Sequence, residues 1–332
     1  MADITISLVI PMYNAARHLE ACLTSVARQT QAGFECLCVD DGSTDDTAAL
    51  AQSFAARDAR FTVVRQPNAG CSAARNSGMR LASAPYLAFL DADDLLHPQA
   101  FEVALGLIQR HQADVATFRH ADVDDAFVLS EPVRYSAGNV PVNVTDTPFL
   151  SFFHPQGDKV KGNPVEIWLN LYRRAAIDGI AFSEGIHFAE DVVFVIKVMH
   201  AIRRQVFTPA TLLFHRNNPA SAINQGVTEK YVRSHAQAAR ALAEHFARQA
   251  SPPEEALLLK RYLSYMIYKA CVSQPARKLG RPEHRAVREC ARNLAAELSA
   301  QGVFDPAAIG LRKRLATWCF LNGWQRLAKS LA

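Results

Sequence analysis

The stretch Phe89-Leu90-Asp91-Ala92-Asp93-Asp94 decides how the rest of this 332-residue chain is interpreted. It ends the apolar run 86–90, which is short, preceded by Pro85 and typical of a buried strand. Acids at the carboxyl end of a parallel strand lie at the sheet edge where open α/β folds bind ligands. An extended backbone points Asp91 and Asp93 to one side, where two oxygen donors suit Mg2+ or Mn2+ bridging to phosphate. An isolated Asp-x-Asp is also typical of a solvated turn or helix cap, so the surrounding sequence has to decide.

Apolar runs and segments of helical spacing alternate around that stretch. Strands are expected at 4–10, 34–39, 61–64, 86–90 and 115–118. Helices are expected to follow them, ending near residue 29, near residue 56 and at residue 82, with another beginning at Pro98. This rhythm of βαβ units predicts an α/β fold with a Rossmann-like, mostly parallel sheet covered by helices.

The pattern changes after this alternating part. Periodicity disappears from Arg119 to about Gly162, which favours a lid or an acceptor loop. Helical spacing resumes at 165–177 and 191–202, and short strands are expected at 206–208 and 212–214. Beyond about residue 226 the chain is helical to its end. We therefore expect a catalytic domain over residues 1–225 and a C-terminal helical, basic domain over residues 226–332.

Composition restricts the location and the partners. Seven cysteines without framework spacing favour a reducing cytoplasm, and no signal peptide or membrane-spanning run is expected. Residues 1–255 carry 22 Lys and Arg against 28 Asp and Glu, whereas residues 256–332 carry 14 against 4. This split predicts an acidic catalytic half and a basic tail that faces an anionic partner or surface. Nucleic acid is not an expected partner.

Polar clusters end four of these segments, and a fifth cluster opens a helix. They are Pro11-Met12-Tyr13-Asn14, Asp40-Asp41-Gly42-Ser43, Ala74-Arg75-Asn76, Asp91-Ala92-Asp93 and Glu190-Asp191. At these residues the chain strongly resembles the family-2 glycosyltransferases, which are nucleotide-sugar-dependent enzymes of the A-type fold. The resemblance covers roughly residues 4–220, and five motifs in order give a strong signal where one alone would be weak.

The resemblance implies a binding site for a nucleotide-diphosphate sugar, taken here as a UDP-sugar, after the first strands. Pro11 and Tyr13 would line the nucleotide, with Tyr13 stacking near the base. Asp41 would accept a hydrogen bond from the uracil edge, and Arg75 would approach the ribose or diphosphate. Each has a plainer interpretation: a half-exposed packing tyrosine, a turn with a cap at 40–43, and a surface arginine.

The resemblance also implies a divalent cation, Mg2+ or Mn2+, that neutralises the departing diphosphate. Asp93 would coordinate it directly, with Asp91 on the ribose or on a metal-bound water. His215 and Arg216 could close over the diphosphate, with His215 as a third metal ligand. A partly buried histidine that is satisfied by protein groups is the alternative for His215.

Asp191 fits the general base that deprotonates the acceptor hydroxyl, and one base without an enzyme nucleophile implies single displacement with inversion. Glu190 would orient the acceptor, or is present only because acids are favoured where a helix starts.

Other enzyme classes fit less of the sequence. Asp91 and Asp93 also resemble the acids of aspartyl-phosphate phosphatases, but the strand is the fourth rather than the first, and Asp41 and Glu190-Asp191 would be unexplained. A sugar nucleotidyltransferase lacks its Gly-rich loop here, and dehydrogenases are excluded by the missing G-x-G-x-x-G. A non-catalytic nucleotide-sugar-binding module remains an alternative, although every carboxylate that the chemistry needs is present.

The expected function is that of a metal-dependent, inverting glycosyltransferase in surface polysaccharide or glycolipid synthesis, with a glycan or a lipid-linked acceptor. Its tail, residues 309–332, holds five Lys and Arg and no acid. Asn322-Gly323 predicts two short helices there, the first with Leu311, Leu315 and Trp318 on one face. The second would present Trp324, Leu327, Ala328 and Leu331 together. The tail either docks on an anionic membrane, at its inner face, or packs on the catalytic domain.

Overall fold

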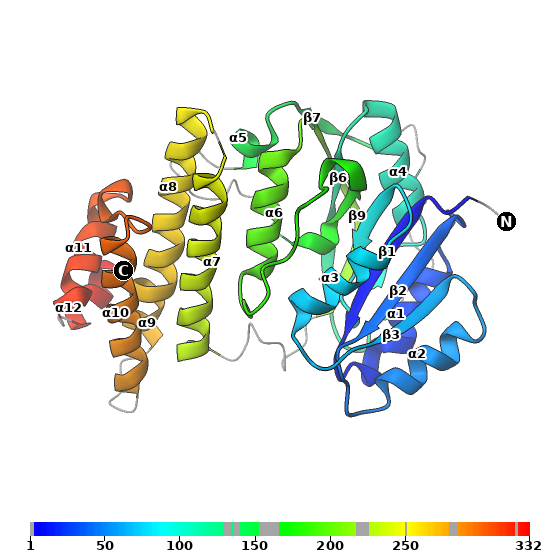
Figure 1. Ribbon diagram of the computed structural model, residues 1–332, viewed down its shortest axis with the longest axis horizontal. Coiled ribbons are helices and arrows are strands. Elements are labelled where there is room, and N and C mark those ends of the chain that lie inside the picture. The colour runs from blue at the N-terminus through cyan, green and yellow to red at the C-terminus, as the bar shows by residue number, and fades with distance from the viewer. Residues whose placement is uncertain are drawn as a thin grey trace. The chain divides into compact units, whose positions relative to one another are not determined.

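A computed structural model of the protein describes residues 3–128, 134–135, 140–152, 166–216, 226–249, 251–278, 284–322 and 325–332, without the side chains of residues 325 and 326. The chain forms two compact units (Figure 1). The first unit comprises residues 1–148, 164–184 and 198–219, and the second comprises residues 149–163, 185–197 and 220–332. Residues 149–163 and 185–197 thus belong to the second unit, whereas a division at residue 225 would place them in the first.

The first unit is built on a nine-stranded mixed sheet in the order β3-β2-β1-β4-β8-β6-β9-β5, with β7 paired to β9. The strands are β1 (Ile6–Met12), β2 (Phe34–Asp40), β3 (Phe61–Arg65), β4 (Tyr86–Phe89), β5 (Leu95–Leu96), β6 (Val115–Val123), β7 (Asn143–Thr145), β8 (Asn170–Arg173) and β9 (Gln205–Arg216). The neighbours β3, β2, β1 and β4 run parallel, so their carboxyl ends open on one edge. The predicted Rossmann-like α/β fold is confirmed.

Three helices connect the parallel strands: α1 (Ala16–Ala27), α2 (Thr47–Ala55) and α3 (Cys71–Leu81). A fourth helix, α4 (Ala100–His111), leads from β5 to β6. The buried face of α1 consists of Leu19, Cys22, Leu23, Ser25 and Val26, which is the spacing that predicted the helix. Helix α3 packs on β1 at Gly78, where a Cβ atom would lie 2.3 Å from Val9 Cγ1. Glycine at this position therefore lets the helix approach the strand closely.

The helix expected at 165–177 was wrong. A short 3-10 turn (Ile167–Leu169) leads into strand β8, which pairs antiparallel with both β4 and β6. This apolar run is buried on both faces of the sheet, and such a run cannot be distinguished from a buried helix by periodicity alone. The short strands expected at 206–208 and 212–214 are parts of the single strand β9, and β6 continues to Val123, beyond the point where periodicity disappears.

The second unit is helical where it is described. Its helices are α5 (Pro148–Phe152), α6 (Glu190–Ala201), α7 (Glu229–Ala247), α8 (Pro253–Ile267), α9 (Gln274–Lys278), α10 (Arg285–Ala300), α11 (Leu311–Leu321) and α12 (Gln325–Leu331), with α5 and α6 each extending into the first unit. The predicted C-terminal helices are therefore confirmed, including the break near Asn322. Within the described ranges, no helix has the length and apolar character needed to cross a membrane.

Candidate active site

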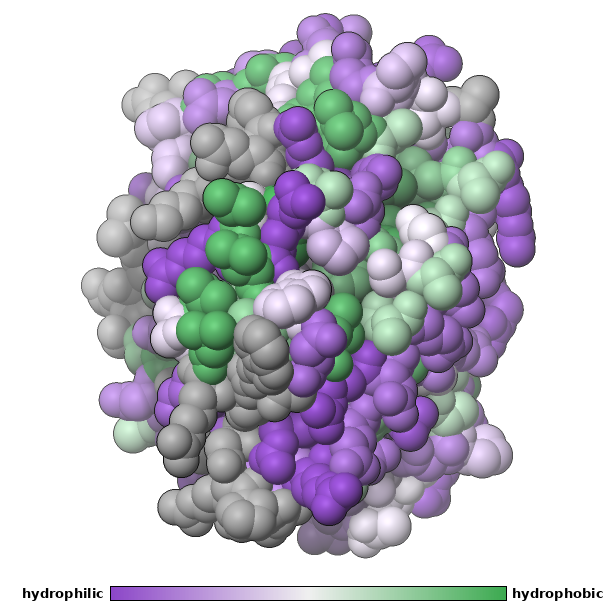
Figure 2. Space-filling model, turned by 90° about the vertical axis from the view of Figure 1, so that its left-hand side faces the viewer, coloured by the Kyte–Doolittle hydropathy of each residue, from purple (hydrophilic) through white to green (hydrophobic). Residues whose placement is uncertain are grey.

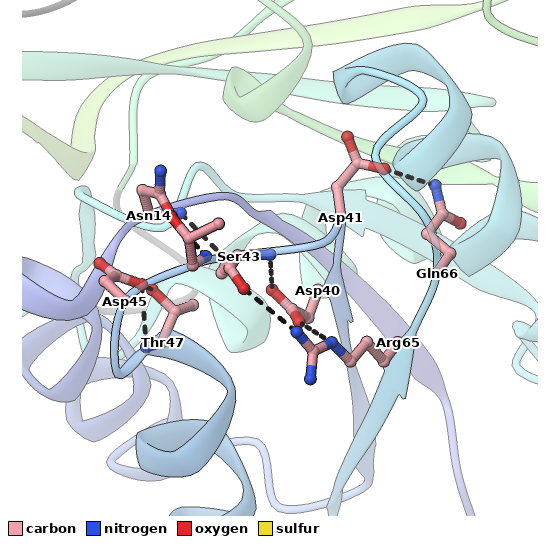
Figure 3. Close-up of polar contacts among 9 residues, drawn as sticks. Asn14, Asp40, Asp41, Ser43, Asp45, Thr47, Arg65 and Gln66 are labelled. Atoms are coloured by element: carbon pink, nitrogen blue, oxygen red, sulfur yellow. Dashed lines mark hydrogen bonds and ion pairs between the residues drawn. The ribbon is translucent and has the colours of Figure 1, made fainter.

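The carboxyl ends of β1 and β2 are tied together by side-chain hydrogen bonds (Figure 3). Asn14 Oδ1 accepts from Thr44 N at 2.9 Å, and Ser43 Oγ accepts from Asn14 N at 3.0 Å. Asn14 has φ +50°, in the left-handed region that asparagine tolerates better than most residues. Asn14 had no role of its own in the sequence-based prediction, yet it fixes the loop that presents Tyr13. The Tyr13 side chain is 53% exposed, as a ring available for stacking would be.

Asp41 holds the loop between β3 and α3. Its Oδ1 accepts from Gln66 Nε2 at 2.8 Å and from Ala69 N at 2.9 Å, and its Oδ2 accepts from Gly70 N at 2.8 Å. Among the described residues, Oδ2 accepts only this one hydrogen bond, so a ligand donor can use its second lone pair. The Asp41 carboxylate therefore both closes the loop and offers one acceptor position.

Neighbouring Asp40 is buried and points to the other side of the turn. Its Oδ1 accepts from Ser43 N at 3.1 Å, and its Oδ2 lies 3.1 Å from Arg65 Nε (Figure 3). The plainer interpretation of the 40–43 cluster, a turn with a cap, thus describes Asp40 and Ser43.

Arg75 is buried on α3 and forms an ion pair with Asp91, in which Nη2 lies 2.9 Å from Asp91 Oδ1. The guanidinium also lies over the Phe182 ring, 5.4 Å from its centroid. The next residue, Asn76, fixes that ring, because its side chain donates to Phe182 O at 3.1 Å and accepts from Phe182 N at 2.9 Å. Arg75 is therefore not a solvated surface arginine, and Asn76, which the sequence analysis placed in a motif without a role, is a positioning residue.

Arg216, at the end of β9, is hydrogen-bonded to the turn that follows β4. The Arg216 N–H donates to Asp94 Oδ1 at 2.9 Å, and its Nε donates to Asp93 O at 3.2 Å. Nη1 reaches Asp125 O at 2.7 Å, so the same side chain also holds the turn after β6. Burial, together with the nearby Asp91 carboxylate, raises the pKa of Asp94 to about 9. The surroundings of Asp94 therefore favour its neutral form.

His215, on β9, belongs to an aromatic cluster with His120 on β6 and Trp168 in the 3-10 turn before β8. Its ring stacks on the Trp168 indole with an angle of 2° between the planes, and His120 meets Trp168 edge-on. Asp122, its partner across β6 and β9, lies with Oδ1 3.0 Å from His215 Nδ1. This contact leaves Nε2 as the ring nitrogen that would bind a metal or a ligand. Trp168 and Asp122 were not predicted as site residues, because their strands meet only in the tertiary fold.

In the second unit, Glu190 and Asp191 begin α6. Asp191 Oδ1 accepts from Val192 N at 2.7 Å, and Ala189 O accepts from Val193 N at 3.1 Å. Ala189 has φ +65°, a conformation that residues with a Cβ atom rarely adopt. The two acids therefore follow a sharp turn that directs the start of the helix.

Comparisons with known proteins bear on the family and on the fold. The family profile described as "Glycosyl transferase family 2" matches residues 7–167, which contain four of the five motifs. The chain belongs to glycosyl transferase family 2. It is 27% identical over 278 residues to "Uncharacterized glycosyltransferase EpsJ" of Bacillus subtilis, an alignment that covers 81% of this chain and 78% of EpsJ.

Solved structures share the fold of this glycosyltransferase. Staphylococcus aureus TarS 1-349 in complex with UDP-GlcNAc has a TM-score of 0.75 at 17% identity, covering 98% of this chain and 90% of that one. The mannosyltransferase PcManGT of Pyrobaculum calidifontis, in complex with GDP-Man and Mn2+, has a TM-score of 0.55 at 16% identity, covering 99% and 87%. Membership of the family decides against the aspartyl-phosphate phosphatase considered from the sequence.

The acids at the end of β4 are the groups of this glycosyltransferase that bear on metal binding. No cluster of three or more His, Cys, Asp or Glu side chains that could hold a metal exists among the described residues. Asp91 is paired with Arg75, and His215 is held by Asp122. Mg2+ needs only one or two carboxylates when phosphates supply other ligands, so Asp93 and Asp91 fit a metal that binds together with a diphosphate. They do not form a site made of protein groups alone.

Proposed function

We propose that this glycosyltransferase transfers a sugar from a UDP-sugar to an acceptor hydroxyl by single displacement with inversion. The observation that carries the proposal is the parallel-strand edge where Asp41 keeps an acceptor position and Arg75 is held against Asp91. The exposed ring of Tyr13 suits a base, the Asp41 carboxylate suits the edge of that base, and the Arg75 guanidinium on α3 suits a diphosphate. TarS, which shares the fold, was solved with UDP-GlcNAc, and this supports the choice of nucleotide.

In this proposal, Tyr13 stacks on the uracil, Pro11 lies beneath it in β1, and Asp41 Oδ2 accepts the uracil N–H. Arg75 and Asp91 bind the ribose and diphosphate as a pair, and Arg216 keeps the Asp93 turn in place. Asp93, with Asp91 as a second donor, would hold Mg2+ or Mn2+ together with the diphosphate, and His215 would close over the diphosphate rather than complete the metal site. The metal, when bound, supplies positive charge for the departing diphosphate.

Asp191 then serves as the general base. It takes the proton of the acceptor hydroxyl as the new bond to the anomeric carbon forms and the bond to the diphosphate breaks, releasing UDP. Glu190 orients the acceptor. Asp191 is suited to the role because its helix start fixes the carboxylate through Val192 N. We expect Asp191→Asn to bind donor normally and to lose about 100-fold in turnover, the scale of acid–base catalysis.

The direct test is a UDP-release screen across nucleotide-sugars with Mg2+ and with Mn2+, comparing the parent chain with Asp191→Asn. Turnover with one UDP-sugar and an acceptor, reduced by the substitution, supports the proposal. UDP binding without turnover by any donor would support the non-catalytic alternative. Normal transfer by Asp191→Asn would move the base to Glu190 or elsewhere.

We further propose that the acceptor is a glycan or a lipid-linked glycan, met at the inner face of an anionic membrane that α11 contacts. Leu311, Leu315 and Trp318 share one face of α11 and are all exposed, with exposed Arg314 beside them. Hydrophobic residues reach the surface beside hydrophilic ones on the face that carries the C-terminal helices (Figure 2). Indole, leucine and arginine side chains together suit a membrane interface, and no acid follows Asp305 in the chain.

The second tail helix contributes less than the sequence predicted. Ala328 is buried rather than presented with Leu327, and Trp324 lies outside the described residues. Lys313 lies over the Tyr265 ring, and Arg312 donates to Ser330 O, so these two cations also pack within the unit. The docking face therefore centres on α11.

Vesicle co-sedimentation tests this docking face. The chain should bind anionic vesicles at low salt and neutral ones weakly. Replacing Leu315 and Trp318 with Ser should reduce binding about tenfold or more, because each removes apolar surface from the interface. Leu257→Ser on α8 is the matched control, since Leu257 is 48% exposed and Leu315 is 45% exposed. Equal binding by all three proteins would leave α11 with a structural role only.

A further inference from the structure

The turn before α6 is held by one hydroxyl group of α7. Ser234 is buried, and its Oγ accepts from His187 N at 2.8 Å and from Phe188 N at 3.1 Å. These residues all belong to the second unit. Two consecutive N–H groups that converge on one oxygen require a bent backbone, because an extended strand points them to opposite sides. The hydroxyl oxygen therefore selects a tight turn at residues 187–188.

A contact between two aromatic rings also holds residues 187–188, at a position on α7 about one helical turn before Ser234. The Phe188 ring lies 5.5 Å from the Tyr231 ring, and Tyr231 is three residues before Ser234 on the same face of the helix. The start of α7 is itself fixed, because Thr228 Oγ1 accepts from Tyr231 N at 3.1 Å and caps it. The turn thus rests on a rigid helix end through a hydrogen-bonded and an apolar contact.

The residue that follows these contacts is Ala189, with its φ of +65°. A residue with a Cβ atom keeps such a conformation only where its surroundings impose it. Its carbonyl accepts the N–H of Val193 and so starts α6, which carries Glu190 and Asp191. The direction of both carboxylates therefore depends on a turn that would relax if its supports were removed.

Ser234 lies in the interior of α7, where serine does not favour helix stability. Inside a helix, alanine is favoured over serine, whose hydroxyl competes for backbone groups. On this face of α7, the serine oxygen instead pairs two N–H groups of another segment, which alanine cannot do. The contact supplies a physical reason for serine at this position.

We propose that Ser234 is a positioning residue for catalysis: its hydroxyl fixes the 187–189 turn and thereby aims the carboxylates of Glu190 and Asp191. The inference rests on the proposed role of Asp191 as general base. Ser234 lies about 40 positions from these acids in the sequence. Its hydroxyl bonds to the backbone of the turn that precedes them and so fixes the backbone from which both carboxylates project.

The experiment compares Ser234→Ala with Ser264→Ala. Ser264 is the matched control, because it is also buried in the second unit, on α8, and its Oγ also accepts from a loop N–H, that of Asp305 at 3.0 Å. Both substitutions should lower the melting temperature. Only Ser234→Ala should speed amide exchange at His187 and Phe188 and lower kcat by about tenfold, with the donor KM within about twofold of the parent.

A second pair of variants covers the case in which Ser234→Ala does not fold. Ser234→Thr keeps the acceptor oxygen and Ser234→Val replaces it with a methyl group of similar size, so we expect Thr to retain kcat and Val to lose it. Ser234→Ala with an unchanged kcat, or Thr and Val with equally low kcat, would overturn the inference. Normal transfer by Asp191→Asn would instead overturn the base assignment, and the amide exchange of Ser234→Ala would still report whether the hydroxyl holds the turn.

Discussion

Asp41→Asn separates the two tasks that the structure gives to this carboxylate. Oδ1 accepts two N–H donors, from Gln66 and Ala69, whereas Oδ2 accepts one, from Gly70. The amide of asparagine must place a donor NH2 group at one of these two positions. At Oδ1 it would face two donors, so the less costly arrangement places it at Oδ2, against the Gly70 N–H.

The magnitude follows from what that arrangement loses. A hydrogen bond to a charged group contributes about 1.5–3 kcal/mol, and the unpaired N–H of Gly70 adds a desolvation cost of about 1–3 kcal/mol. Together these make about 2.5–6 kcal/mol for the loop. If about 2 kcal/mol of this appears in binding, we expect UDP affinity to fall about 30-fold or more. The same change removes the oxygen that would accept the uracil N–H.

The assay is calorimetric titration with UDP, together with amide exchange at Ala69 and Gly70. Asp45→Asn is the control, since Asp45 also accepts backbone N–H groups, from Thr47 and Ala16, but is exposed and has no proposed contact with the donor. It should leave UDP affinity within about threefold of the parent. Unchanged UDP affinity in Asp41→Asn, with faster exchange at Gly70, would refute the proposed link between this loop and the nucleotide.

Three further predictions concern neighbouring positions. Gly78→Ala should lower the free energy of unfolding in urea by about 1–3 kcal/mol, because the new Cβ atom would lie 2.3 Å from Val9 Cγ1. The control Gly106→Ala, which has open space around it, should leave the stability unchanged or raise it by up to about 1 kcal/mol. Equal stabilities of the two variants would contradict the packing of α3 on β1. Asp93→Asn should remove the gain in UDP affinity that Mn2+ provides, measured by calorimetry with and without the metal, and an unchanged gain would move the metal away from Asp93. Asn76→Ala should lower the free energy of unfolding by about 2–3 kcal/mol, since it leaves buried backbone groups of Phe182 unpaired. It should also weaken UDP binding, because Arg75 packs on the Phe182 ring. A stable variant with normal UDP binding would show that the Phe182 contact is dispensable.

The amino-acid sequence determined the elements whose signals are local. Alternating apolar runs and helical spacing predicted β1 to β4 and α1 to α3, because short parallel units leave a clear period and end at polar residues. Five motifs in order predicted the family, and the strand-end acids predicted where its chemistry would lie. The tail helices followed from a glycine stop and a change of apolar face, both of which are local.

The tertiary structure decided what depends on distant partners. The apolar run at β8 became a strand only because β4 and β6 lie on either side of it, which no period along the chain records. Asn76, Asp122 and Ser234 acquire roles through contacts with residues that lie 46 to 106 positions away. Whether a carboxylate is hydrogen-bonded or favours its neutral form is likewise set by burial and neighbours, as Asp41 and Asp94 show, because desolvation and hydrogen bonding are properties of the folded surroundings.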